Sequence, residues 1–117
     1  MNISDSELKL MELIWNSEPV KSGELVKIAF DELGWKKSTV YTVIKKLTEK
    51  GAVKSENTVI SSLCRREDVL GEKSEKLIKK GYGGSLPVFL TAFLSREKLT
   101  REQAEELKRL IDDAVDQ

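Results

Sequence analysis

The stretch WKKSTVYTVIKKLTEKGAV, residues 35–53, decides the fold. Its apolar residues recur at i, i+3, i+4 and i+7, the spacing that places side chains on one side of an α-helix. These four residues are Val40, Val43, Ile44 and Leu47. Gly51 follows them and is suited to ending a helix. The stretch therefore predicts one amphipathic helix with a buried apolar side.

The other side of this predicted helix is polar and basic. The stretch and the residue after it hold six lysines against the single Glu49, a local charge of about +5 in a chain whose formal net charge is zero. The lysines are Lys36, Lys37, Lys45, Lys46, Lys50 and Lys54. Such a surface suits the phosphates of a nucleic acid. On composition alone, a solvated helix whose lysines only keep the protein soluble explains it equally well.

The elements around this helix favour DNA binding. Ser4 and Glu7 have capping-box spacing, and the helix that they start runs to about Asn16, with Leu8, Met11 and Trp15 inside and Leu10 and Ile14 broadening that side. A second helix starts near Lys21 or Ser22 and ends at Gly34. Residues 52–55 and 59–63 predict two short strands that form a wing. This order is that of a winged helix-turn-helix, whose third helix enters the DNA major groove.

The predicted DNA-binding residues lie at the start of the third helix or just before it. They are Trp35, Lys37, Ser38, Thr39, Tyr41, Thr42, Lys45 and Lys46. We expect Tyr41, Thr39 and Thr42 to select the sequence, and Lys45 and Lys46 to hold phosphates. Because the helix contains no arginine, A·T pairs are the expected targets. For Trp35, packing on the second helix and donation to a phosphate are both open.

The predicted wing tip, residues 56–58, has no cation. A tip of this kind should grip the DNA backbone weakly, so we expect Asn57 and Thr58 to contribute little to DNA affinity.

From about residue 66 the composition changes. Residues 66–80 are highly charged with few apolar positions, as in an arm that needs a partner, and glycines around Tyr82 predict a hinge. Two helices follow, one starting at Ser85 with Pro87 in its first turn and one starting at a Thr100–Gln103 capping box. The residues predicted to form a dimer core are Leu77, Leu86, Phe89, Leu90, Phe93, Leu94, Leu107, Leu110 and Ile111. We therefore predict a DNA-binding domain over residues 1–65 and a helical dimerisation domain over residues 66–117.

So small a C-terminal part makes a poor core alone and a good one when shared with a second copy. The alternative is a lid that folds back over the winged helix of the same chain. A symmetric dimer would read an inverted repeat in double-stranded DNA.

Composition excludes several function classes. The chain has no histidine and a single cysteine, Cys64, so it lacks the residues for most metal sites and for histidine-activated nucleophiles. Cys64 is expected to be a small buried residue and not a redox or metal site. No long apolar run or signal peptide is visible. We expect a cytoplasmic protein that is not an enzyme, needs no metal or cofactor and contacts no membrane.

Three segments resemble the penicillinase repressors, a family that includes regulators of β-lactamase, methicillin resistance and copper transport. They are residues 3–15 (ISDSELKLMELIW), the run from Trp35 to Gly51, and residues 83–94 (GGSLPVFLTAFL) followed by residues 98–112 (KLTREQAEELKRLID). The resemblance covers nearly the whole chain. It implies a winged-helix repressor that forms a homodimer through its C-terminal helices. It also implies operators with TACA and TGTA half-sites.

The resemblance implies regulatory routes that the chain matches only in part. In antibiotic-responsive members a membrane-bound sensor protease leads to cleavage of an Asn-Phe bond, and the matching pair here is Ala92-Phe93. Copper-responsive members carry a C-terminal cysteine cluster, which residues 112–117 lack. The inducing signal is therefore not fixed by the sequence.

The sequence as a whole predicts a mostly α protein with a small β-wing that acts as a DNA-binding repressor. The competing function is a winged helix that docks another protein without reading DNA. A docking face should carry apolar anchors where Ser38, Thr42 and Lys45 stand, and this favours DNA binding.

Overall fold

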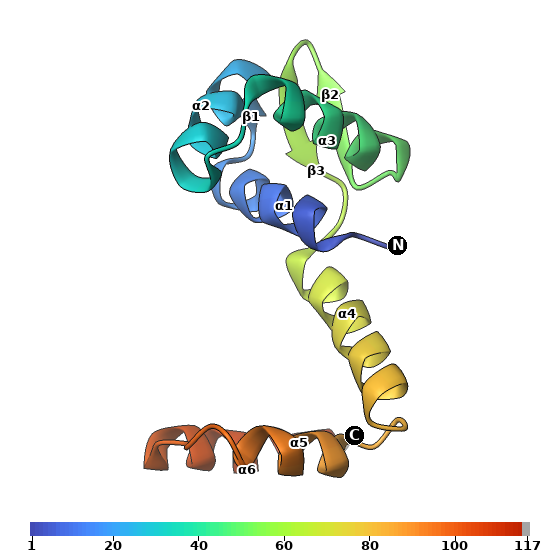
Figure 1. Cartoon of the computed structure of the whole chain (residues 1–117), viewed down its shortest axis with the longest axis vertical. Coiled ribbons are helices and arrows are strands. Elements are labelled where there is room, and N and C mark those ends of the chain that lie inside the picture. The colour runs from blue at the N-terminus through green and yellow to red at the C-terminus, as the bar shows by residue number, and fades with distance from the viewer. Residues whose placement is uncertain (116–117) are drawn as a thin grey trace. The chain divides into compact units, whose positions relative to one another are not determined.

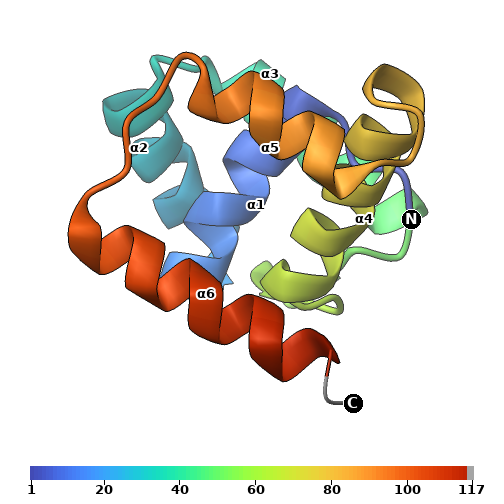
Figure 2. The ribbon, with the colours of Figure 1, turned by 90° about the horizontal axis from the view of Figure 1, so that it is seen from below.

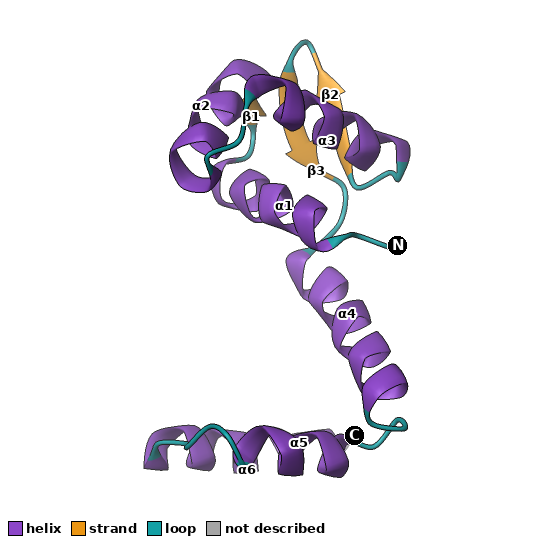
Figure 3. Cartoon of the chain, viewed as in Figure 1, coloured by secondary structure: helices purple, strands orange, loops and turns teal. Residues whose placement is uncertain are grey.

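The computed structural model describes residues 1–115 and confirms the predicted fold class: a mostly helical chain with one small antiparallel sheet (Figures 1 and 3). It separates into two units, Met1–Ser74 and Glu75–Gln117. The first unit holds α1 (Asp5–Ser17), β1 (Val20–Lys21), α2 (Ser22–Leu33), α3 (Lys37–Glu49), β2 (Val53–Glu56) and β3 (Val59–Ser62). α4 (Arg66–Gly81) begins in the first unit and ends in the second, which also holds α5 (Leu86–Leu94) and α6 (Arg101–Val115).

The start of α1 follows the predicted capping box. The backbone N–H of Glu7 donates to the Ser4 hydroxyl over 3.1 Å, and the Ser4 N–H donates to the Glu7 carboxylate over 2.8 Å. The predicted inner side needs correction, because Leu10, Met11 and Ile14 are fully buried while Leu8 and Trp15 are only partly buried at the edge of the core. Trp15 keeps a core role, and its indole N–H donates to the Cys64 carbonyl over 3.0 Å.

The predicted third helix is confirmed as α3, with bounds narrower than the stretch 35–53. All four predicted apolar residues are buried, and the N–H of Ala52 donates to the Leu47 carbonyl. Gly51 at φ 78° turns the chain toward β2, so Val53 belongs to the sheet. α2 ends as predicted, with Gly34 in the left-handed conformation that glycine adopts without steric cost.

The wing hairpin is confirmed, and the sheet has one strand more than predicted. β3 pairs antiparallel with β2, with Val53 opposite Ser62 and Glu56 opposite Val59. The additional strand β1 places Val20 opposite Ile60 on the other edge of β3. β1 has only two residues, too short for an alternating pattern to reveal.

The prediction that residues 66–80 have too few apolar positions to pack without a partner is wrong for the start of α4. Val69 is 4% exposed within the core of the first unit, and Arg66 pairs with Glu12 of α1 over 2.9 Å. Side chains at these positions share one side of a helix, so a few contacts suffice to dock it. The first compact unit therefore includes the start of α4 and extends to Ser74, while the division into a DNA-binding domain over residues 1–65 and a dimerisation domain over residues 66–117 stays a prediction.

The second unit leaves its apolar side chains uncovered. The predicted caps are present: the Val88 N–H donates to the Ser85 hydroxyl, and Thr100 and Gln103 exchange two hydrogen bonds. α5 and α6 are joined by a loop and lie apart in Figure 2. None of residues 75–115 is buried. The predicted dimer residues Phe89, Leu90 and Leu107 are partly exposed, and the other six, Leu77, Leu86, Phe93, Leu94, Leu110 and Ile111, are exposed.

Within residues 1–115, no helix is both long enough and apolar enough to cross a membrane.

Candidate nucleic-acid interface

The exposed side of α3 carries two parallel rows of side chains. One row contains Ser38, Thr42 and Lys46, and the other contains Lys37, Tyr41 and Lys45, each with the i, i+4 spacing that stacks side chains along a helix. All six residues are exposed, while Val40, Val43, Ile44 and Leu47 hold the opposite side in the core. The helix is therefore fixed by its apolar side and presents both polar rows outward.

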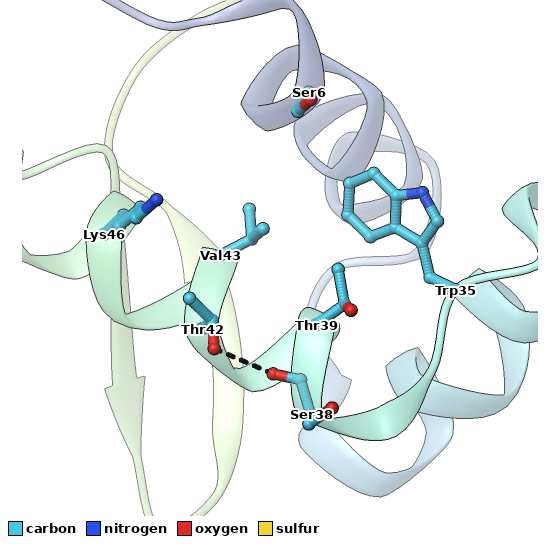
Figure 4. Close-up of a pocket in the computed structure, with 7 residues that line it drawn as sticks. All are labelled: Ser6, Trp35, Ser38, Thr39, Thr42, Val43 and Lys46. Carbon is cyan, nitrogen blue, oxygen red and sulfur yellow. Dashed lines mark hydrogen bonds between the residues drawn. The ribbon is translucent and has the colours of Figure 1, made fainter.

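The first row borders an open hollow of about 410 Å³ between α3 and the start of α1. Figure 4 shows the side chains of Trp35, Thr39 and Lys46 around it, with Ser6 of α1 on the far side. The Thr42 hydroxyl donates to the Ser38 carbonyl over 2.9 Å, so its proton is engaged and its oxygen can only accept. A hollow with hydroxyls, an indole and an ammonium at its rim can hold a phosphate oxygen.

The second row is centred on Tyr41. Its side chain is 40% exposed, and its hydroxyl lies 3.4 Å from the Ser22 hydroxyl at the start of α2. The Lys37 ammonium lies 6.0 Å from the centre of the Tyr41 ring, within the range of a weak cation–π contact. Tyr41 therefore contacts the start of α2 and Lys37 while it stays exposed to solvent.

Trp35 lies just before α3 and is partly buried against the core. It borders the hollow beside Ser6 and also a second, more apolar one next to Val26 and Phe30 of α2. Of the two roles left open by the sequence, the structure shows packing, against the core of the first unit. Donation to a phosphate stays a prediction.

Two of the six lysines counted as phosphate-facing lie outside α3 and contact other residues of the protein. Lys50 donates to the Asn2 carbonyl over 2.6 Å and pairs with the nearly buried carboxylate of Glu7. Lys54 lies 3.9 Å from Glu56 on the wing. The local charge of about +5 therefore overstates what α3 offers to DNA, and Lys37, Lys45 and Lys46 are the cations that its two rows present.

Two contributors to this surface were not predicted. Ser6 lies between the capping-box residues Ser4 and Glu7, and Ser22 was predicted only as a possible start of the second helix. Both are brought to α3 by packing between distant segments, for which a single sequence holds no local signal. The wing tip, Asn57 and Thr58, adds no cation to the surface.

Cys64 lies between β3 and α4 and is partly buried, with its thiol 3.6 Å from the Ala52 carbonyl. Burial raises the pKa of this thiol, and the nearby carboxylates of Glu18, Asp68 and Glu72 raise it further. The group is therefore held as a neutral thiol near pH 7.

Comparison with known families agrees with this geometry. The family model described as Penicillinase repressor matches residues 3–113. The chain belongs to the penicillinase repressor family. The family is one of transcriptional repressors that bind DNA, and the winged helix of the first unit is the fold expected for that task.

Individual members of the family are distant in sequence but similar in length. A penicillinase repressor of Bacillus licheniformis is 26% identical over 115 residues, covering 95% of this chain and 90% of the relative. One from Staphylococcus aureus is 27% identical over 117 residues, with 97% and 93% covered. The methicillin resistance regulatory protein MecI of Mammaliicoccus sciuri is 25% identical over 114 residues, with 94% and 93% covered.

Proposed function

We propose that this protein represses transcription by binding an inverted-repeat operator in double-stranded DNA as a homodimer. The observation that carries the proposal is the exposed side of α3, whose two polar rows stand on a helix fixed by a buried apolar stripe. Bound at a promoter, such a dimer would block access to it.

The residues have different tasks in this proposal. Lys45, Lys46 and Lys37 hold phosphates, together with Trp35 and Ser38 at the rim of the hollow. Tyr41, Thr39 and Thr42 face the bases, where a hydroxyl oxygen can accept from a base edge and a threonine methyl can meet the methyl group of thymine.

Dimerisation is proposed from the second unit. None of residues 75–115 is buried, so the apolar residues of α5 and α6 stay exposed to water in a single chain. A symmetric dimer would bury them against the same apolar surface of a second copy. Two copies double the phosphate contacts and present two recognition helices to one side of the duplex.

Release is proposed to act on the same helices. Opening the dimer would lower the affinity for DNA without any change to α3. Phe93 stacks on Phe89 at a centroid distance of 6.1 Å, and the pair Ala92-Phe93 stands where the family resemblance places a cleavage bond. A sensor protease acting there stays a prediction from that resemblance, and the inducing signal is left open.

The test is selection of binding sites from a pool of random duplex DNA at about 0.15 M salt, where non-specific charge binding is weak. We expect an inverted repeat. A single half-site would mean that the protein binds DNA as a monomer, and no enrichment would overturn DNA reading in favour of a protein-docking function. A Tyr41→Ala variant in the same selection is expected to return a degenerate half-site.

A further inference from the structure

The N-terminal residues before α1 form a link between the end of α3 and the start of α4. The side chain of Ile3 is 2% exposed and belongs to the core, which anchors this segment in the first unit. The backbone carbonyls of Asn2 and Ile3 accept hydrogen bonds from two different parts of the chain. The Asn2 carbonyl accepts from Lys50, which follows α3, and the Ile3 carbonyl accepts from Lys73 of α4, each over 2.6 Å.

Both lysines are held by a second partner. Lys50 pairs with Glu7, whose side chain is 5% exposed. Lys73 lies 3.5 Å from Asp5, and its own side chain is 29% exposed. The carbonyls of Asn2 and Ile3 thus accept one ammonium group from the residue after α3 and one from α4.

Lys73 also completes a row along α4. Arg66 pairs with Glu12, Val69 enters the core, and Lys73 reaches the Ile3 carbonyl, so the docked side of α4 repeats at i, i+3 and i+7. Beside it, the N-terminal ammonium of Met1 pairs with Glu72 over 2.9 Å, so Glu72 and Lys73 together tie the second turn of α4 to the segment before α1. The rest of α4 leads into the second unit, where dimerisation is proposed.

We propose that Lys73 is a positioning residue that, through the Asn2–Ile3 segment and Lys50, fixes the start of α4 against the end of α3 and thereby sets the half-site spacing that the dimer accepts. The inference rests on the proposed function. A recognition helix that can shift relative to α4 tolerates operators of several spacings, whereas a fixed one tolerates few.

The test measures affinity for operators whose two half-sites are separated by the selected spacer or by a spacer two base pairs longer. Two base pairs displace and rotate one half-site by about 7 Å and roughly 70°. We expect the unaltered protein to lose roughly tenfold in affinity on the longer spacer, a loss similar to that for one mismatched base pair. Lys73→Met keeps the aliphatic stem, removes the donor, and should reduce this loss to about threefold or less.

Three comparisons separate positioning from other effects. Lys73→Arg restores a charged donor and should restore the spacing preference. Lys79→Met removes the same charge from the last turn of α4 and should keep the tenfold loss. Affinity for a single half-site should be the same in Lys73→Met as in the unaltered protein, which shows that its winged helix is folded.

Two results would overturn the inference. One is a Lys73→Met variant with the same spacing preference as the unaltered protein. The other is an equal loss of affinity on both spacers, which would mean that Lys73 only adds charge or stability. If the unaltered protein itself does not distinguish an inverted repeat from a single half-site, the proposed dimer function fails instead.

Discussion

Glu7 is the one buried charged residue among residues 1–115, and one of its carboxylate oxygens accepts from both the Ser4 N–H and the Lys50 ammonium. Burial alone would raise the pKa of Glu7, but hydrogen bonds from Lys50 and Ser4 and the charge of Lys50 outweigh it, so the pKa lies below its ordinary value of 4.5. A lowered pKa in the folded state stabilises the protein above the unfolded value, and this stabilisation is lost as the pH falls through the folded value.

Glu7→Gln is therefore expected to lower the free energy of unfolding at pH 7 by about 1–3 kcal/mol, because Lys50 would lose its charged partner. The difference from the unaltered protein should shrink as the pH falls below 4.5 and through the lowered pKa. Urea titrations at several pH values measure this. Glu24→Gln in the exposed first turn of α2 is the control, with a change within about 0.5 kcal/mol. A difference that does not depend on pH would contradict the assigned role of the charge.

Lys46 and Tyr41 stand in different rows of α3, and their substitutions should have different consequences. Lys46→Ala is expected to weaken binding to all sequences and to reduce the salt slope by about 1, as for one lost phosphate contact. Tyr41→Ala should leave the salt slope unchanged and reduce the preference for the selected operator over a scrambled duplex. Fluorescence anisotropy at four salt concentrations separates the two effects. Equal loss of sequence preference in both variants would refute this division.

At the scale of elements, periodic helices could be predicted from the sequence, and elements defined by tertiary pairing could not. α3 and its buried stripe followed from the spacing of Val40 to Leu47. β1 exists only because Val20 and Lys21 pair with β3. The docking of α4 depends on one apolar residue, Val69, and on charged side chains, and these do not form the apolar stripe that predicts a packed helix. The candidate site divides in the same way: the α3 rows were visible in sequence, and the contributions of Ser6 and Ser22 were not.

The β2–β3 turn offers an element-scale prediction. Asn57 and Thr58 both have positive φ, 52° and 65°, as a two-residue hairpin turn demands. Asn tolerates this conformation, but the branched Thr58 is strained in it. Thr58→Gly should remove this strain. Glycine also gives the unfolded chain more conformational entropy, which offsets part of the gain, so the free energy of unfolding should rise by about 0.5–1 kcal/mol.

Thermal unfolding measures this change, with Asn57→Gly as the matched control for which little gain is expected. The Thr58 carbonyl accepts from the Ser22 N–H over 2.8 Å, and glycine keeps that bond. A lower melting temperature for Thr58→Gly would show that the threonine side chain stabilises the turn in a way that outweighs its backbone strain.

At the scale of the whole molecule, the decisive property is the uncovered apolar surface of α5 and α6. Leu110 is 58% exposed and Ile111 48% exposed on α6, so a charge at Leu110 should disturb the single chain little and an interface between two chains greatly.

Leu110→Asp is therefore expected to be monomeric at concentrations where the unaltered protein is a dimer, with its helix content retained. Sedimentation equilibrium and circular dichroism measure the two properties. Arg109→Asp places the same carboxylate about 100° around α6 from Leu110, outside the apolar side formed by Leu107, Leu110 and Ile111, and should stay dimeric. The monomeric variant should bind a single half-site as the unaltered protein does and lose its advantage on the inverted repeat, because only two linked recognition helices gain from the second half-site. Were Leu110→Asp to remain a dimer, α6 would lie outside the interface, and the apolar residues of α5 alone would have to hold the two copies together.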